Sequence, residues 1–261
     1  MEIGFFDSGI GGLTVLYQAL KLLPNEDYLY YADTIHVPYG EKSKSEIKEY
    51  IMAAADFIAK HNVKALVVAC NAATSAAIAD LRNKYAFPVI GIEPAVKPAI
   101  QYRGANKRVL VLATRLTLQE EKYTDLVKQL DQEQIVDGLP MPTLVTLAEN
   151  FEFDEDIVLP YLREQLSPLP LDQYETVVLG CTHFPFFKDM LRKVFPPSVA
   201  IIDGSIGTAK NLKRILEARH DLNQSGTGRI DFYNSGVKVT DPYLLSQYAQ
   251  LLKRLHDIEM A

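Results

Sequence analysis

Cysteine is scarce in this chain of 261 residues, which contains two, Cys70 and Cys181, and tryptophan is absent. Two cysteines cannot build a disulfide framework, and the sequence has neither the Cys-x-x-Cys nor the His-x₃₋₅-His spacing typical of zinc sites. The apolar runs are far shorter than a membrane span, and the N-terminus lacks the features of a secretory signal. These absences predict a cytoplasmic protein with free thiols, no metal and no membrane contact.

A positive net charge is also lacking. The formal net charge is −6, which argues against a broad nucleic-acid surface and predicts no nucleic-acid partner. Apolar residues make up 48% and charged residues 23% of the chain, as in ordinary globular proteins with a sizeable core.

Short apolar runs rich in Ile, Val and Leu are the main structural signal that is present. They predict strands at 2–6, 28–33, 65–70, 88–93, 108–114, 176–181 and 199–203. Unbroken apolar runs of this length suit strands buried on both faces, as in parallel sheets. Segments with helical spacing lie between them, so the sequence predicts an α/β fold with mainly parallel sheets.

Two helices carry clear start signals. Residues 43–61 have an apolar stripe, and Ser43 with Glu46 fits a capping box at its start. Residues 241–255 begin with an Asp cap followed by Pro242 and carry leucines along one face.

The chain divides into two similar halves. Polar, turn-rich stretches near 97–107 and 203–208 suggest breaks, and each half has a strand that ends in a small polar turn and another that ends in a cysteine. We therefore predict a first α/β domain of residues 1–97 plus 208–261 and a second of residues 98–207. The tail, 209–261, is predicted to contain one long helix and a short strand at 229–236, and to pack on the first half.

Polar and reactive side chains follow several of the predicted strands. Ligands bind at the carboxyl ends of the strands in open α/β sheets, so these side chains would meet in a cleft between the two halves. The residues are Asp7, Ser8, Cys70, Asn71, Cys181, Thr182 and His183. The glycine-rich FDSGIGG turn (6–12) suits a tight approach to an anion, although it is neither a P-loop nor GxGxxG.

Two thiols facing each other across a ligand suit the inversion of a stereocentre. One thiolate removes a proton from one face of a carbon, and the opposite thiol delivers a proton to the other face. Asp7 and His183 could tune or relay these protons. Four alternatives stay open at this point: each cysteine as a small core residue, a redox pair, a zinc-dependent hydrolase, or a non-catalytic module that binds a dicarboxylate.

Four motifs, DSGIGG (7–12), ADTIHVPYG (32–40), ACNAAT (69–74) and GCTHFP (180–185), together resemble those of the glutamate racemases, in order and spacing over nearly the whole chain. The resemblance implies two similar α/β domains with the active site between them. It also implies cofactor-independent racemisation of glutamate by two thiols, supply of D-glutamate for peptidoglycan, and a homodimer. Aspartate is the alternative substrate.

The resemblance also assigns roles. Cys70 and Cys181 match the catalytic thiols that serve the D- and L-enantiomers, respectively, with Asp7 and His183 beside them. Substrate contacts are implied for Asp7, Ser8, Tyr39, Gly40, Asn71, Ala72, Thr74, Thr182 and His183. Supporting roles fall to Asp33, Glu149, Thr114 and Thr117. The sequence departs from the family at Ala72, where a threonine is usual and for which Thr74 could compensate, and at Leu116 and Glu120, near the pocket for the side-chain carboxylate.

Overall fold

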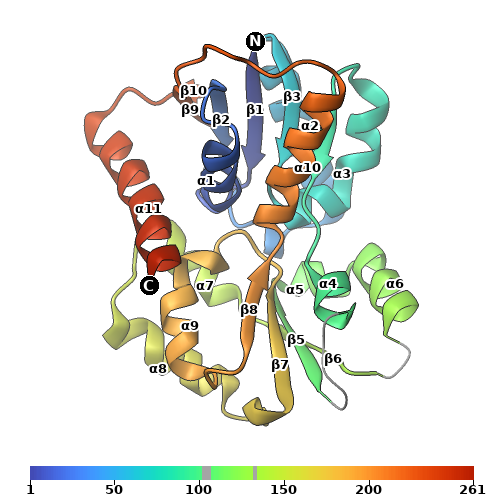
Figure 1. The fold of residues 1–261 in the computed structure, drawn as a ribbon, viewed down its shortest axis with the longest axis vertical. Helices are drawn as coiled ribbons and strands as arrows, with labels where there is room; N and C mark the ends of the chain where they lie inside the picture. The colour runs from blue at the N-terminus through green and yellow to red at the C-terminus, as the bar shows by residue number, and fades with distance from the viewer. Residues whose placement is uncertain (102–106, 132–133) are drawn as a thin grey trace.

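Two separate β-sheets organise the chain (Figure 1). The computed structural model describes residues 1–101, 107–131 and 134–261. The first sheet has the order β10-β9-β2-β1-β3-β4 and is parallel except for β10. Its strands are β1 (Glu2–Asp7), β2 (Tyr28–Ala32), β3 (Val63–Val68), β4 (Val89–Gly91), β9 (Ile230–Asn234) and β10 (Val237–Lys238).

The second sheet is parallel throughout and has the order β6-β5-β7-β8. Its strands are β5 (Arg108–Ala113), β6 (Val136–Pro140), β7 (Tyr174–Leu179) and β8 (Ala200–Asp203). The predicted α/β class with mainly parallel sheets is thus confirmed.

Helices cover both sheets and define two lobes. The first lobe is the six-stranded sheet with α1 (Leu13–Leu22), α2 (Lys44–Ala59), α3 (Asn71–Lys84), α10 (Ser205–Ala218) and the short 3₁₀ helix η1 (Tyr39–Glu41). The second lobe is the four-stranded sheet with α4 (Val96–Gln101), α5 (Arg115–Gln119), α6 (Glu121–Leu130), α7 (Pro142–Glu149), α8 (Glu155–Leu166), α9 (Lys188–Val194) and the 3₁₀ helices η2 (Leu171–Gln173) and η3 (Phe184–Phe187). Among the described residues, no helix is both long and apolar enough to cross a bilayer.

The central strands form where the apolar runs predicted them. β2 and β3 are buried along their whole length, and β1 and β5 are buried beyond their first residue. β6 was not predicted, because its sequence VDGLP contains residues that disfavour strands and because it is a partly exposed edge strand. The predicted break near 97–107 includes residues 102–106, which lie outside the described part of the chain.

The two predicted helices are confirmed. Ser43 accepts a hydrogen bond from the amide of Glu46, and Glu46 binds the amide of Ser43, so the capping box is complete. The helix predicted at 241–255 runs further, as α11 (Pro242–Met260). The prediction of one helix in 209–261 was wrong, because most of α10 also lies there; Leu212 and Leu216 are fully buried on its inner face.

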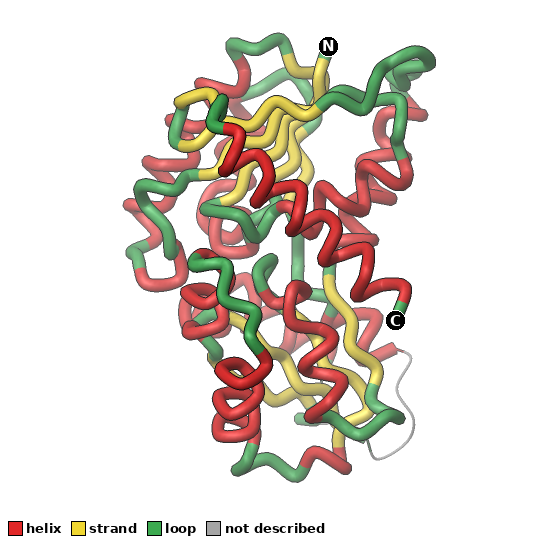
Figure 2. Tube along the Cα trace, turned by 90° about the vertical axis from the view of Figure 1, so that its left-hand side faces the viewer, coloured by secondary structure: helices red, strands yellow, loops and turns green. Residues whose placement is uncertain are grey.

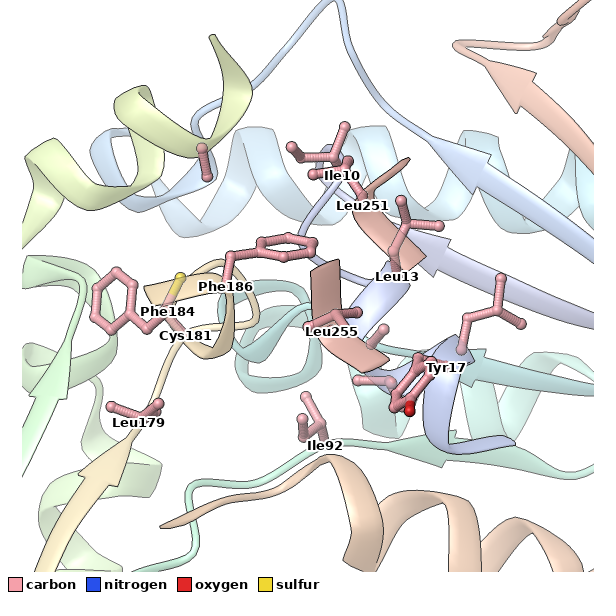
Figure 3. Close-up of a cluster of buried hydrophobic side chains, with 14 of the residues drawn as sticks. Ile10, Leu13, Tyr17, Ile92, Leu179, Cys181, Phe184, Phe186, Leu251 and Leu255 are labelled. Carbon is pink, nitrogen blue, oxygen red and sulfur yellow. The ribbon is translucent and has the colours of Figure 1, made fainter. Parts of the chain in front are cut away.

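The C-terminal segment connects the lobes. β9 pairs with β2, which brings the tail back to the first lobe as predicted, while α11 crosses the junction and leads to the C-terminus beside the second lobe (Figure 2). Leu251 and Leu255 of α11 belong to a buried cluster that includes Leu13 of the first lobe and Phe186 of the second (Figure 3). Nη2 of Arg254 in α11 also donates to both carboxylate oxygens of Asp189 in α9, at 2.8 and 3.0 Å.

Candidate active site

A small cavity lies between the lobes, where the central strands of the two sheets end. Its volume is ≈ 20 Å³, which is room for about one water molecule. It is lined by Ser8, Pro38, Tyr39, Gly40, Cys70, Asn71, Ala72, Thr114, Thr117, Val145, Gly180, Cys181, Thr182 and His183. Both cysteines and most of the residues singled out in the sequence therefore meet at one place. Pro38, Val145 and Gly180 were not predicted as site residues, although Pro38 and Gly180 lie within the ADTIHVPYG and GCTHFP motifs.

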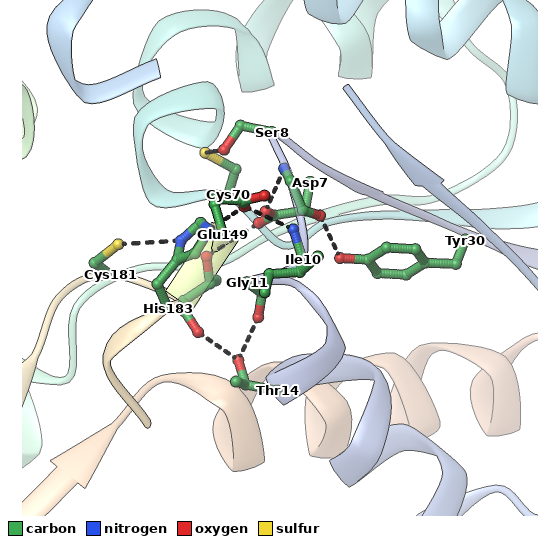
Figure 4. A network of polar contacts seen from close by, with 12 residues as sticks. Asp7, Ser8, Ile10, Gly11, Thr14, Tyr30, Cys70, Glu149, Cys181 and His183 are labelled. Atoms are coloured by element: carbon green, nitrogen blue, oxygen red, sulfur yellow. Dashed lines mark hydrogen bonds and ion pairs between the residues drawn. The ribbon is translucent and has the colours of Figure 1, made fainter. Parts of the chain in front are cut away.

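Cys70 follows β3 and precedes the first turn of α3. Its thiol donates a hydrogen bond to the Ser8 hydroxyl, with 3.7 Å between sulfur and oxygen (Figure 4). Burial, and then the negative charge of Asp7, raise the pKa of Cys70 to about 12. Cys70 is therefore held in the protonated form in the free protein.

Asp7 ends β1 and is fully buried, so it lies behind the cavity wall rather than in it. Its carboxylate accepts hydrogen bonds from the amide of Gly9 at 2.9 Å and from the Thr182 hydroxyl at 3.1 Å. Burial raises the pKa of Asp7 to about 6, opposed by the positive charge of His183. Asp7 is thus a carboxyl group that can exchange a proton near neutral pH.

Cys181 follows β7 and has a different partner. Its sulfur lies 3.6 Å from Nδ1 of His183, and Nε2 of the same ring lies 2.6 Å from the Glu149 carboxylate (Figure 4). Burial works to lower the pKa of His183, but the hydrogen bonds to Cys181 and Glu149 outweigh it and raise this pKa well above its ordinary value. The ring therefore bridges the Cys181 sulfur and a carboxylate, an arrangement that favours its protonated form.

The glycines of the FDSGIGG turn let the second lobe approach. A Cβ atom added to Gly9 would lie 1.8 Å from Oε1 of Glu149, and one added to Gly11 would lie 2.5 Å from Nδ1 of His183. The amide of Ile10 donates to Glu149 at 2.9 Å across the same junction. This turn therefore receives the Glu149–His183 pair, and the anion that its Ile10 amide binds is the carboxylate of Glu149.

Two further residues of the first lobe support this contact, and neither was predicted. The Thr14 hydroxyl lies 2.9 Å from the carbonyl oxygen of Gly11 and 3.1 Å from that of Thr182 in the second lobe. The buried Tyr30 donates to the carbonyl of Gly9 at 2.8 Å (Figure 4). Hydroxyls that bind backbone carbonyls belong to no motif, which explains why they were missed.

Tyr39 and Gly40 form another part of the wall. The Tyr39 hydroxyl donates to Asp33 at 2.6 Å, and Asp33 also contacts His36 and Ser235, so Asp33 holds Tyr39 from outside the cavity. A Cβ atom on Gly40 would lie 2.8 Å from Cβ of Thr114 in the second lobe.

Thr114 and Thr117 line the cavity from the second lobe. Their hydroxyls lie 3.0 Å apart, and Thr114 caps α5 by accepting from the amide of Thr117. On the opposite side, Oδ1 of Asn71 is buried and has no hydrogen-bond partner among the described residues. A buried, unpaired acceptor is costly, so this oxygen is available to a donor group of a ligand.

Thr74 does not reach the cavity. Its hydroxyl donates to the carbonyl of Val68 at 3.1 Å and accepts from the amide of Ile92 at 3.2 Å, so it cannot supply the hydroxyl that Ala72 lacks. Leu116 and Glu120 are likewise absent from the lining, so the departures at these positions lie outside the cavity wall.

The side chains around the site do not form a metal centre. Within 1–101, 107–131 and 134–261, no group of three or more His, Cys, Asp or Glu side chains has an arrangement that could hold a metal ion. The zinc alternative thus has no ligand set in the described part of the chain.

Comparison with known proteins gives a consistent result. Residues 17–210 match the family model described as Asp/Glu/Hydantoin racemase. The chain is 57% identical to glutamate racemase 2 of Bacillus subtilis, over 99% of this chain and 98% of that protein, and 53% identical to the glutamate racemase of Halothermothrix orenii, over 98% and 100%. Escherichia coli glutamate racemase, solved with L-glutamate and an activator, superposes with a TM-score of 0.81 at 32% identity, covering 95% of each chain. The chain belongs to the Asp/Glu/Hydantoin racemase family and, within it, to the glutamate racemases.

Proposed function

We propose that Cys70 and Cys181 interconvert L- and D-glutamate as a pair of acid–base thiols, without a cofactor. One observation carries the proposal: the chain's two cysteines, one from each lobe, line the same cavity. A substrate between them would present opposite faces of its α-carbon to the two sulfurs. Inversion of a stereocentre needs such an arrangement.

With L-glutamate, Cys181 is the base. Cys181, whose sulfur lies beside the His183 ring, acts as the thiolate that takes the proton from Cα, and the electron pair of the broken C–H bond stays on the substrate. The Cys70 thiol then gives its proton to the opposite face of Cα. Its raised pKa suits this role, because Cys70 carries a proton until the carbanion needs one.

The first turnover leaves a thiol at Cys181 and a thiolate at Cys70, which is the arrangement that accepts D-glutamate. The reverse reaction then uses Cys70 as the base. Asp7 adjoins Cys70 electrostatically and His183 contacts Cys181, so each sulfur has a neighbour that can relay protons. Closure of the two lobes around the substrate would exclude bulk water, which would strengthen these interactions around the weakly acidic α-proton.

The remaining lining residues would hold the substrate. Asn71, Thr182 and nearby backbone amides suit its α-carboxylate and ammonium groups, with Ser8, Tyr39, Gly40 and the backbone of Ala72 completing that wall. Thr114 and Thr117 suit the side-chain carboxylate. We further propose that the product D-glutamate serves peptidoglycan synthesis and that the protein is a homodimer, as the family resemblance implies.

We also propose the domain boundaries 1–97 plus 208–261 and 98–207. The division of strands between the two sheets supports them. α4 contacts β5 and β7 of the second lobe and begins two residues before the proposed boundary at 98. α10 contacts α1 of the first lobe and begins three residues before the proposed boundary at 208.

The test is proton exchange at Cα. L-Glutamate and, separately, L-aspartate are incubated with the protein in D₂O without added cofactor, and loss of the Cα–H signal is followed by NMR together with optical rotation. We expect exchange and loss of rotation with glutamate. Exchange with aspartate alone would move the assignment to the alternative substrate. Exchange with neither would refute the racemase proposal, and ligand-induced stabilisation without exchange would indicate a binding module.

A further inference from the structure

Helix α5 presents two side chains to the first lobe. Leu116 packs against the buried cluster of the first lobe that contains Cys70 and Tyr39. Glu120 follows one turn later, at the junction of α5 and α6, and its Oε2 accepts hydrogen bonds from Nζ of Lys44 at 2.9 Å and from the Ser75 hydroxyl at 3.2 Å. Both of these partners belong to the first lobe, Lys44 at the start of α2 and Ser75 within α3.

Glu120 makes these contacts from a buried position. Its side chain is 8% exposed, whereas that of Lys44 is 52% exposed. A carboxylate at such depth needs a partner, and Glu120 does not use its side chain to cap α6, although it occupies the N-cap position. Its carboxylate instead binds Lys44 and Ser75 across the junction between the lobes. These two contacts therefore exist only while the lobes are closed.

The closed arrangement cannot admit substrate. Residues of both lobes line the cavity, so the lobes have to separate before glutamate enters and come together again once it is bound. α5 also carries Thr117, which lines the cavity, and is capped by Thr114, which touches Gly40 across the junction. An interaction that holds α5 to the first lobe thus also positions the wall around the substrate.

We propose that Glu120, bound by Lys44 and Ser75, is a positioning residue that holds the lobes closed over bound substrate. This proposal rests on the proposed function and deepens it. The sequence marked Glu120 only as a departure from the family near the carboxylate pocket; here it acts on closure. Leu116, on the same face of α5, gives the apolar part of the same contact.

The test compares Glu120→Gln and Lys44→Met with Lys48→Met. Lys48 lies on the same helix as Lys44 and forms an ion pair of similar length, 2.8 Å, with Asp80, but that pair joins α2 and α3 within the first lobe. Weaker closure lowers affinity for bound substrate without altering the thiols, so we expect KM for glutamate to rise about 3- to 10-fold in both test variants, with kcat within about 2-fold of wild type. Lys48→Met should leave both constants unchanged.

Coupling and rescue sharpen the test. KM of the double variant Glu120→Gln/Lys44→Met should be no higher than that of either single variant, because the two substitutions remove the same interaction. Added salt should raise KM in the wild type more than in the variants, and Lys44→Arg should restore wild-type KM. An unchanged KM in both test variants, or a loss of kcat with KM unchanged, overturns the proposal.

A second measurement does not depend on turnover. Amide hydrogen exchange of α5 and of η1, which face each other across the junction, should accelerate in Glu120→Gln and Lys44→Met but not in Lys48→Met. Absence of Cα–H exchange in the wild type would refute the racemase function alone, whereas unchanged amide exchange in both test variants would refute the closure role alone.

Discussion

The two halves of the site share a layout but differ in their proton chemistry. In each, a cysteine, Cys70 or Cys181, lies two residues after the end of a central parallel strand. Cys70 faces a hydroxyl and lies near a buried carboxyl group, whereas Cys181 contacts an imidazolium that is itself bound to Glu149. A symmetric fold therefore holds an asymmetric pair of thiols. Two enantiomers have equal free energies, so the reaction needs no symmetry between its two bases.

Removing either thiol gives the largest expected effect. Cys70→Ala and Cys181→Ala should each lower kcat by more than about 1,000-fold, because either loss removes one of two obligatory proton transfers. Stereochemical assays in both directions check this, and circular dichroism and thermal unfolding confirm that the fold is intact. Near-normal turnover in either single variant would contradict the two-thiol assignment.

Kinetic isotope effects distinguish the two sides of the site. His183→Asn and Asp7→Asn should each lower kcat/KM by about 100-fold, since each removes a proton relay beside one thiol. With deuterium at Cα, His183→Asn should show the larger isotope effect on L-glutamate, whose α-proton goes to Cys181. Asp7→Asn should show the larger isotope effect on D-glutamate, whose α-proton goes to Cys70.

The expected pattern is a crossing of isotope effects between the two variants. Equal isotope effects in both directions for both variants would mean that Asp7 and His183 do not serve separate thiols. Because kcat/KM of any variant must be equal in the two directions, rates alone could not reveal this difference.

Stability against pH gives the smallest expected effect. The folded pKa of Asp7, about 6, lies above its ordinary value of 3.8, so ionisation costs stability; the cost is absent below pH 3.8 and complete above about pH 6. Asp7→Asn should therefore raise the free energy of unfolding by on the order of 1–3 kcal/mol at neutral pH, and by little near pH 4. Urea unfolding at the two pH values measures this.

Asp203 is the matched control. It is also a carboxyl group deep in the structure, but its pKa is lowered: burial raises it, and Lys188 and Ser205 more than offset that effect. Asp203→Asn should therefore lower the free energy of unfolding at neutral pH, and lower it by less in acid. A loss of stability at neutral pH in Asp7→Asn would contradict the assigned effect of burial.

Sequence patterns predicted the buried strands well, and the physical reason is clear. β3 and β7 lie in sheet interiors, so their apolar runs are unbroken and visible. β6 and β10 lie at sheet edges; β6 pairs with the distant strand β5, and β10 pairs with the adjacent β9 but has only two residues. The bounds of α3, one of the helical segments expected between strands, were not predicted, because it is rich in alanine and its two faces differ little. α10 could have been found, since Ala209, Leu212 and Leu216 follow helical spacing.

The candidate site shows the same limit. Cysteines at strand ends marked the cavity, because that location follows from local sequence. The interactions between the lobes could not be predicted in this way, since Thr14 and Glu120 bind partners more than 40 residues away in the sequence. A single sequence places Glu120 near Thr117 but cannot indicate that its side chain faces Lys44.

The absence of side chains at the glycines of the FDSGIGG turn determines how closely the two lobes approach each other. Where Gly9 and Gly11 meet Glu149 and His183, the lobes come together through space that a side chain would fill. A single methyl group at either position would occupy the space in which the first lobe meets the second. Such a methyl group would displace Glu149 or His183, the two side chains that lie next to Cys181 in the site.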